Sequence, residues 1–233
     1  MSEIFSEKPL ISAVIPVYNG ERFLAEALES VLSQDYPSVE VLAIDDGSTD
    51  GTAAICKRFA GLRYIWQTNQ GLAAARNRGI REASGEFAAV LDADDLWVSD
   101  KLSLQMDYLL RHPELDFVLS RIKNFLEPGV PEPPWWRDEE LQNRAFSVTT
   151  LLARKTALDR LGYFDESYRH AEDMEWLLRV KEKGARYFLM PEILLHRHIH
   201  SEHMSQDIEK NRRYAFEILK TAIERKRNGP FEI

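Results

Sequence analysis

The chain has 233 residues, of which 44% are hydrophobic and 29% are charged, a composition typical of one large α/β domain with a substantial core. Its formal charge of −8 argues against nucleic acid as the main partner. The single cysteine, Cys56, excludes an internal disulfide, and neither a secretory signal in residues 1–10 nor an apolar run near the ~18 residues of a membrane span is visible, so we expect a cytoplasmic protein.

The first 95 residues alternate between strand-like and helix-like segments. Strands are expected at 10–17, 39–44, 62–66 and 87–91, and helices at 21–33, 52–59 and 72–83. We expect Pro16 to loosen the first strand because proline donates no ladder hydrogen bond, and Asp50 to cap the second helix. This order predicts right-handed crossovers and a mostly parallel sheet. No Gly-x-Gly-x-x-Gly motif follows the first strand, which argues against a dinucleotide cofactor.

The second part of the chain is less regular. We expect strands at 115–125, 145–154 and 186–195, and helices at 99–111, 155–161, 174–184 and 206–226. Ser99 is the expected cap of the first of these helices. Residues 127–137 contain four prolines and two tryptophans, which predicts an irregular loop.

Three carboxylates follow the apolar run at residues 87–91, namely Asp92, Asp94 and Asp95. Acids at the end of a buried strand are unfavourable unless a cation neutralises them. Ligands of open α/β sheets lie beyond the carboxyl ends of the strands, and oxygen ligands at this spacing suit Mg or Mn. The alternative is an Asp-rich turn that caps the next helix.

Seven motifs occur in one order along the chain. They are Val-Ile-Pro-Val-Tyr-Asn (14–19), Ile-Asp-Asp-Gly-Ser-Thr-Asp-Gly-Thr (44–52), Asn-Gln-Gly-Leu-Ala-Ala-Ala-Arg-Asn-Arg-Gly-Ile (69–80), Leu-Asp-Ala-Asp-Asp (91–95), Gly-Tyr-Phe-Asp-Glu (162–166), Glu-Asp-Met-Glu-Trp-Leu-Leu-Arg (172–179) and Arg-His-Ile-His (197–200). Because of these motifs, residues 10–205 resemble the family 2 glycosyltransferases, which are inverting enzymes of the GT-A fold.

The resemblance implies a Rossmann-like, mostly parallel central sheet flanked by helices, with a C-terminal acceptor-side extension. It implies a single GT-A domain over residues 1–233, made of a nucleotide-binding half (10–95), an acceptor and catalytic half (96–205) and a C-terminal helix (206–233). The implied reaction moves a sugar from a nucleotide-sugar donor, often a UDP-sugar, to a saccharide or lipid-linked acceptor with Mg or Mn.

The resemblance also assigns nucleotide-binding roles to individual residues. In the family, the positions of Pro16, Tyr18 and Asn19 lie near the base, and a carboxylate at Asp45 or Asp46 accepts a hydrogen bond from the uracil or ribose. Arg76 opens toward the same cleft, where its fork of donors suits a base or a diphosphate. Asp92 is expected at the ribose.

Metal and catalytic roles follow in the same way. Asp94 is the expected direct metal ligand, and His200 matches a histidine that completes the metal site in several family members. His196, His198 and His203 crowd the same segment, so which histidine meets the metal stays open, as does a mere surface cluster. Asp173 matches the base that deprotonates the acceptor hydroxyl, with Glu172 beside it; the alternative is a pair of acids favoured by a helix N-terminus.

Several features have no settled role. Trp135 and Trp136 can stack on an acceptor sugar or cover the edge of the core. The basic C-terminal helix can touch an anionic membrane or present a solvated face. The rival functions are a sugar-phosphate nucleotidyltransferase, although residues 18–21 lack its Gly-rich basic loop, and a non-catalytic nucleotide-sugar-binding protein. A monomer and a homodimer both remain open.

Overall fold

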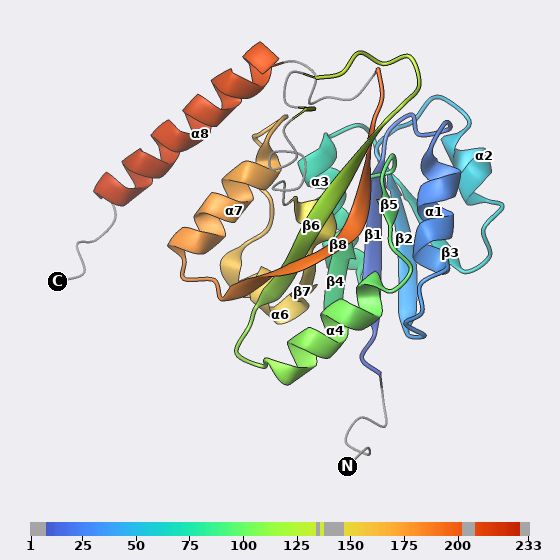
Figure 1. Cartoon of the computed structure of the whole chain (residues 1–233), viewed down its shortest axis with the longest axis horizontal. Helices are drawn as coiled ribbons and strands as arrows, with labels where there is room; N and C mark the ends of the chain where they lie inside the picture. The colour runs from blue at the N-terminus through green and yellow to red at the C-terminus, as the bar shows by residue number, and fades with distance from the viewer. Residues whose placement is uncertain (1–7, 134–135, 138–146, 202–207, 229–233) are drawn as a thin grey trace.

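The computed structural model describes residues 8–133, 136–137, 147–201 and 208–228. Its centre is an eight-stranded sheet in the order β3-β2-β1-β4-β7-β6-β8-β5 (Figure 1). The strands are β1 (Ile11–Val17), β2 (Val39–Asp45), β3 (Leu62–Trp66), β4 (Phe87–Val90), β5 (Leu96–Trp97), β6 (Phe117–Leu126), β7 (Leu152–Arg154) and β8 (Tyr187–Ile199). The first four strands are mutually parallel, β7 is antiparallel to both β4 and β6, and β6 pairs parallel with β8.

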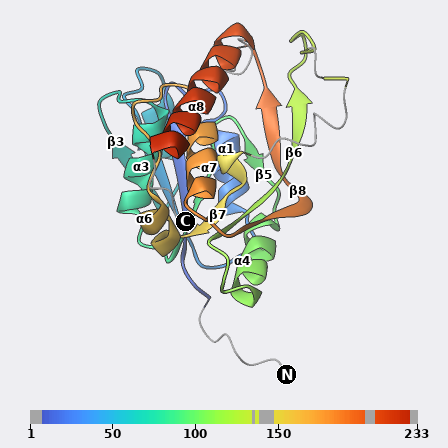
Figure 2. The same ribbon diagram turned by 90° about the vertical axis from the view of Figure 1, so that its left-hand side faces the viewer.

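Helices cover both faces of this sheet (Figures 1 and 2). They are α1 (Leu24–Leu32), α2 (Thr52–Cys56), α3 (Leu72–Glu82), α4 (Lys101–Arg111), α6 (Lys155–Leu161), α7 (Glu172–Glu182) and α8 (Ile208–Asn228), with a 3-10 turn at Val148–Thr150. None of the helices in the described ranges is both long and apolar enough to cross a membrane.

Two apolar clusters form the core, one on each face of the sheet. Alternate residues of β1 divide between them, with Ile11, Ala13 and Ile15 on the side of α1 and α4, and Val14 on the side of α3, α6 and α7. Side chains alternate along a strand, so a strand buried on both faces needs a nearly continuous apolar sequence. The first strand therefore lies at the centre of the molecule.

Most expected elements are confirmed, including the parallel βαβ order and the helix at 155–161. Three differ in ways with local causes. Of the expected strand at 145–154, residues 145 and 146 lie outside the described residues, and among residues 147–154 only Leu152–Arg154 form a strand, because the Ser147 side chain accepts from the amide of Thr149 and turns the chain into the 3-10 turn. Ser99 is not the cap of α4, since Asp100 occupies that position. The helix expected at 52–59 ends at Cys56, and its N-cap is Gly51 rather than Asp50, although Asp50 accepts from the Thr52 amide at 3.0 Å.

Three further differences bear on the site. The two-residue strand β5 is too short for a periodic pattern and exists through its pairing with β8. Helix α7 begins two residues earlier than expected, which puts Glu172 and Asp173 in its first turn. Pro16 does not loosen β1 on the β2 side, where the register continues to Val17, whereas pairing with β4 ends at Val14.

Candidate functional site

Most of the predicted site residues lie at strand ends or in the loops that follow them, at one edge of the sheet. Because β1, β2 and β4 are parallel neighbours, their carboxyl ends share an edge, the upper one in Figure 1. Two backbone hydrogen bonds continue the strand pairing at this edge. The amide of Asp46 donates to the carbonyl of Val17 at 2.8 Å, and the amide of Leu91 donates to the carbonyl of Val14 at 3.0 Å. The loops that start at Tyr18, Asp46 and Asp92 are therefore neighbours.

The loop after β1 is tied to the loop after β2 through Asn19. The Asn19 amide donates to Ser48 Oγ at 2.9 Å, and the Thr49 amide donates back to Asn19 Oδ1 at 2.9 Å. Asn19 has a φ of 51°, a left-handed conformation in which a short polar side chain with local hydrogen bonds is tolerated best. Next to it, Tyr18 is 56% exposed, so its ring presents a flat surface at the strand end.

The two acids that end β2 are buried and have partners within the protein. Asp45 accepts from the Ser48 amide at 2.7 Å and from the Tyr64 hydroxyl at 2.5 Å. Burial and the hydrogen bond to Asp45 raise the pKa of Tyr64 well above its ordinary value, which keeps this hydroxyl a donor. These bonds shape the loop after β2, so a direct contact of Asp45 with a nucleotide stays a prediction.

Asp46 joins the loop after β2 to the start of α3. One of its oxygens accepts from the side chain of Gln67 at 2.7 Å and from the amide of Gln70 at 2.9 Å, and the other accepts from the amide of Gly71 at 2.8 Å. Gly71 has a φ of 97°, which only glycine adopts easily. Asp46 thus fixes the entry to α3, and its contact with a nucleotide also stays a prediction.

Arg76 on α3 connects Asp92, at the end of β4, with Glu172, at the start of α7. It is 2% exposed; its Nη2 lies 2.6 Å from Asp92 Oδ1, and its Nη1 pairs with Glu172 Oε1. Burial acts to lower the pKa of Arg76, but the charges of Asp92 and Glu172 more than offset it and raise that pKa above its ordinary value. Arg76 therefore holds the end of β4 against the start of α7, and its expected contact with a base or diphosphate stays a prediction.

The first turn of α7 carries the two acids expected for catalysis, and they differ in environment. Glu172 is 4% exposed and paired with Arg76; burial raises its pKa above the ordinary value even though Arg76 opposes the shift. Asp173 is half-buried, and its Oδ1 accepts from the amide of Met174 at 2.8 Å. The preceding Ala171 has a φ of 57°, an unfavourable conformation for a residue with a Cβ. Such strain is typical of functional loops.

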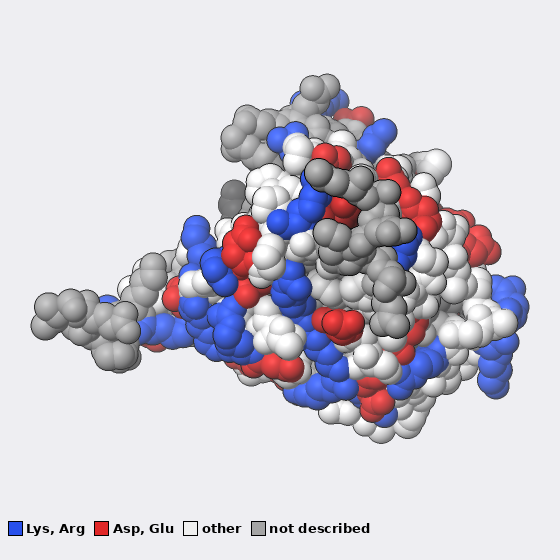
Figure 3. Space-filling model, turned by 90° about the horizontal axis from the view of Figure 1, so that it is seen from below, with Lys and Arg blue, Asp and Glu red and all other residues white. Residues whose placement is uncertain are grey.

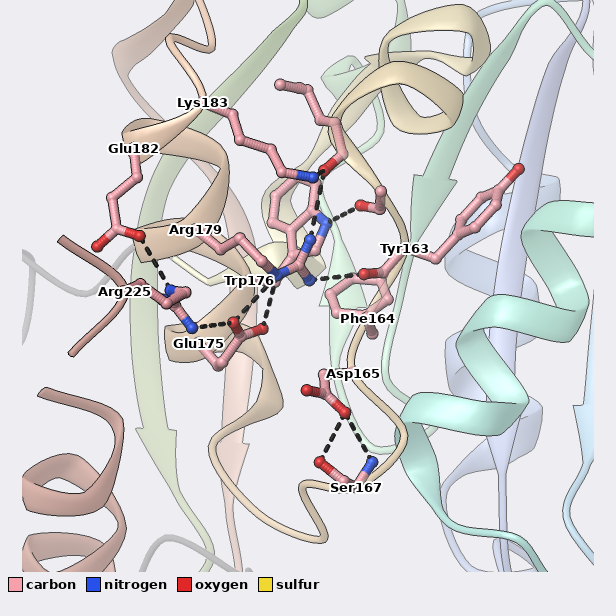
Figure 4. A network of polar contacts seen from close by, with 12 residues as sticks. Tyr163, Phe164, Asp165, Ser167, Glu175, Trp176, Arg179, Glu182, Lys183 and Arg225 are labelled. Carbon is pink, nitrogen blue, oxygen red and sulfur yellow. Dashed lines mark hydrogen bonds and ion pairs between the residues drawn. The ribbon is translucent and has the colours of Figure 1, made fainter. Parts of the chain in front are cut away.

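The loop after α6 holds α7 in place. The indole of Trp176 donates to the carbonyl of Gly162 at 2.8 Å, and Arg179 donates to the carbonyl of Tyr163 at 2.6 Å (Figure 4 labels Trp176, Arg179 and Tyr163). From the other side, Asn77 of α3 donates to the carbonyl of Phe164 at 2.8 Å and accepts from its amide at 2.9 Å. The motif at 162–166 thus fixes α7 relative to α3, a role that its sequence alone did not indicate.

Asp94 and His200 are the two residues that were predicted as metal ligands, and the structure places them side by side. His200 Nε2 lies 3.0 Å from Asp94 Oδ2, and the side chains are 7% and 29% exposed, respectively. Within the described ranges no group of three or more His, Cys, Asp or Glu residues can hold a metal ion. A carboxylate and an imidazole nonetheless fit a cation that takes its remaining ligands from phosphate oxygens and water.

The neighbours of this pair, Asp95 after β4 and the histidines of β8, have different contacts. Asp95 is buried and accepts from the amide of His198 at 3.1 Å, which fixes the end of β8. Burial and the neighbouring Asp94 raise the pKa of Asp95 well above its ordinary value, while Arg197 opposes the shift. The ring of His198 lies 4.8 Å from Phe23 and 4.5 Å from Phe125, and burial lowers its pKa. His196 pairs with Leu96 in the sheet. Of the described histidines, His200 is therefore the one beside Asp94.

The predicted acceptor residues are only partly described. Trp136 is half-buried, and its amide donates to the carbonyl of Pro133 at 2.9 Å. Trp135 and His203 lie outside the described residues. The acceptor role of both tryptophans stays a prediction.

Comparison with known proteins decides the family. Glycosyl transferase family 2 matches residues 12–169, more than half of the chain. The chain belongs to glycosyl transferase family 2. The match spans the loops after β1, β2 and β4 and ends just before α7, and the GT-A fold predicted from the motifs is confirmed.

Individual relatives agree with this family 2 assignment. The chain is 34% identical over 203 residues to EpsE of Bacillus subtilis, which is named as a glycosyltransferase, covering 80% of this chain and 72% of that protein. A glycosyltransferase of Rickettsia felis is 44% identical over 113 residues, but these are 47% of this chain and 18% of that protein. The chain thus spans much less than the length of that relative.

Two solved structures share the fold. S. aureus TarS in complex with UDP has a TM-score of 0.67 and 26% sequence identity, covering 82% of this chain and 60% of that chain. Mannosyltransferase PcManGT from Pyrobaculum calidifontis, in complex with GDP-Man and Mn2+, has a TM-score of 0.67 and 25% identity, covering 89% of this chain and 65% of that chain.

Proposed function

We propose that this chain is an inverting glycosyltransferase that moves a sugar from a nucleotide-sugar, most simply a UDP-sugar, to an acceptor hydroxyl with the help of a divalent cation. The observation that carries the proposal is the arrangement of two acidic groups around Arg76. On one side lie Asp92 and the Asp94–His200 pair, and on the other lie Glu172 and Asp173. Direct displacement needs both a stabilised leaving group and a base for the incoming hydroxyl.

The donor would lie across the ends of β1, β2 and β4. The exposed ring of Tyr18 offers a stacking surface for a base, and Asp92, whose side chain is 30% exposed, can accept from a ribose hydroxyl. Among the structural neighbours, TarS is described with UDP and with UDP-GlcNAc, and PcManGT with GDP-Man. These complexes support a nucleotide-sugar donor for this chain.

Asp94 and His200 would hold the cation. A divalent cation there supplies positive charge that stabilises the nucleoside diphosphate as it leaves. An imidazole ligand favours Mn2+ over Mg2+, because Mg2+ prefers an all-oxygen shell. The Mn2+ in the PcManGT complex is consistent with that preference.

Asp173 is the better candidate for the base. Glu172 is buried and paired with Arg76, whereas Asp173 is half-buried and keeps part of its surface open to solvent. Asp173 would take the proton of the acceptor hydroxyl as its oxygen attacks the anomeric carbon from the face opposite the nucleotide, which inverts the configuration. The loop that contains Trp135 and Trp136 would contact the acceptor, a saccharide or a lipid-linked sugar.

Calorimetric titration tests this proposal. UDP-, GDP- and dTDP-sugars are titrated into the protein in Mn2+, in Mg2+ and in a chelator. We expect one nucleotide to bind at least about tenfold tighter in Mn2+ than in chelator, a difference of about 1.4 kcal/mol. Asp94→Asn should abolish this difference, because an amide is a poor ligand for a hard cation.

The matched control is Asp107→Asn, which changes an exposed aspartate of α4 that pairs with Arg111 on the same helix. It should bind the donor like the parent protein. Equal nucleotide affinity in Mn2+ and in chelator, or an equal effect of both substitutions, would contradict the assigned metal site.

A further inference from the structure

Helix α8 forms the outermost layer on one side of the molecule and is separated from the sheet by α7 (Figures 1 and 2). Its inner face is well packed: Ile218 is fully buried and Ala222 is 7% exposed. Arg225 reaches Glu175 and Glu182 of α7, each at 3.1 Å (Figure 4). These contacts fix which face of α8 points away from the protein.

The exposed surface of α8 carries an apolar stripe. Phe216, Leu219 and Ile223 are 70%, 52% and 59% exposed and follow one another at intervals of three and four residues, so they form one continuous stripe. Phe216 is the most exposed large apolar side chain among the described residues. Burial in the core does not explain this stripe, because its three side chains stay exposed while α8 buries Ile218 and Ala222 on a neighbouring face.

Basic side chains accompany the stripe. Arg213, Lys220 and Arg227 are exposed and lie three or four residues from Phe216 or Ile223, which places each of them beside the apolar stripe. On the left of Figure 3, Lys and Arg side chains gather with Asp and Glu side chains among them. The chain as a whole carries a formal charge of −8, so this cationic face is local. Glu217 and Glu224 lie further round the helix, with Glu217 3.7 Å from Arg213.

We propose that this face of α8 binds an anionic lipid bilayer, lying in the plane of the surface with Phe216, Leu219 and Ile223 inserted among the acyl chains. An apolar stripe bordered by Lys and Arg is the pattern of interfacial helices, in which the apolar side chains enter the boundary of the acyl region while the basic ones meet anionic headgroups. The long stems of Lys220 and Arg227 allow their charges to remain at headgroup level.

A second copy of the chain fits this face less well. A symmetric dimer pairs the same surface of each copy with itself. Antiparallel contact of two α8 helices would therefore bring the basic residues of one stripe against those of the other, and like charges across an interface are unfavourable. An anionic bilayer instead neutralises them.

Vesicle sedimentation of the whole chain tests the proposal. Vesicles of phosphatidylcholine alone are compared with vesicles that also contain phosphatidylglycerol, at low and at high salt. We expect binding to the anionic vesicles to be about a hundredfold tighter, because three basic side chains each contribute about fivefold near an anionic surface. High salt should reduce this difference. A Phe216→Trp variant should show a blue shift of its emission on anionic vesicles only.

Matched variants separate apolar insertion from charge. Leu219→Ser should weaken binding about tenfold, whereas Leu32→Ser, which changes an exposed leucine of α1, should not. Lys220→Glu should weaken binding about 25-fold, since it removes one attraction and adds one repulsion, whereas Lys57→Glu on another exposed surface should have little effect. All four positions are exposed, so each variant should keep the melting temperature of the parent protein.

Three results would overturn the proposal: no vesicle binding, equal binding to both vesicle types, or a concentration-dependent dimer in sedimentation velocity that Leu219→Ser dissociates. The last result would assign the face to a second copy. The assay needs no donor or acceptor, so its failure leaves the proposed transferase activity untouched, and a failure of that activity leaves the lipid surface untouched.

Discussion

Replacement of Arg76 by methionine tests the buried link between the two acidic parts of the site. The side chains of Arg76 and Glu172 are 3% and 5% exposed, whereas that of Asp92 is 30% exposed. Methionine fills a similar volume but leaves both carboxylates without their cation. Asp92 can regain water, so most of the destabilisation comes from Glu172. Breaking a buried pair in this way costs about 3–5 kcal/mol, and we expect about 3 kcal/mol near neutral pH.

The loss of stability in Arg76→Met should depend on pH. Burial already raises the pKa of Glu172 while Arg76 opposes the shift, so removal of Arg76 raises that pKa further. The folded variant then keeps a proton that the unfolded chain releases above about pH 4.3. Stability therefore falls as pH rises from that value through the folded-state pKa of Glu172. The deficit of Arg76→Met relative to the parent should be larger at about pH 8 than at about pH 5.

Urea unfolding followed by tryptophan fluorescence measures both effects, since Trp176 is fully buried beside the site. The double variant Arg76→Met/Glu172→Gln should recover about 2 kcal/mol at the higher pH, because the uncompensated charge is gone. The control is Arg63→Met: Arg63 also contacts two acids, Glu40 and Glu82, but its side chain is 41% exposed, so we expect a loss below about 1 kcal/mol. Equal losses for Arg63→Met and Arg76→Met, or a loss independent of pH, would refute the reasoning.

Three other predictions concern single positions. Lys101 is fully buried and contacts Gln105 and the Trp97 ring but no acid among the described residues, so burial lowers its pKa well below the ordinary value. Lys101→Met should therefore raise the free energy of unfolding at neutral pH, and this gain should shrink as pH rises toward about 10.4. Urea titrations at several pH values measure both effects. Ala171→Gly should raise Tm by about 2–4 °C in calorimetry, because it relieves about 1 kcal/mol of left-handed strain; an unchanged or lower Tm would count against that strain. His200→Ala should weaken Mn2+-dependent nucleotide binding more than Mg2+-dependent binding in calorimetry; equal losses would remove His200 from the metal site.

The elements that were predicted well are those whose own sequence carries a regular apolar pattern. Strand β1 and helix α3 appear within a residue of the expected bounds, because each carries a continuous apolar run or a helical repeat. Strand β5 could not be found in this way, since two residues carry no period and only its pairing with β8 defines it. The described part of the segment before β7 differed from the expectation because Val148 is buried in a 3-10 turn rather than in a strand.

The candidate site was predictable as a set of residues but not as a set of contacts. The order of the motifs placed Asp94 and His200 in the same site, and the structure puts them 3.0 Å apart. The pairing of Arg76 with Glu172 joins residues 96 positions apart, and no local pattern encodes it. The bonds that Asp46 receives from Gln67, Gln70 and Gly71 likewise depend on how two loops meet, so the structural role of this acid emerges only from the fold.

The most direct test of the central claim is the transfer rate of Asp173→Asn, measured with a donor selected by titration and an acceptor found by screening. Asparagine keeps the size and most of the hydrogen bonding but cannot take a proton. We predict that nucleotide and Mn2+ affinity stay within about twofold of the parent while the transfer rate falls by roughly 10²-fold or more, the scale of general-base catalysis. The product of the parent enzyme should have the anomeric configuration opposite to that of the donor. Transfer by Asp173→Asn at the parental rate would contradict the assignment and make Glu172 the next candidate, and a product with retained configuration would contradict direct displacement.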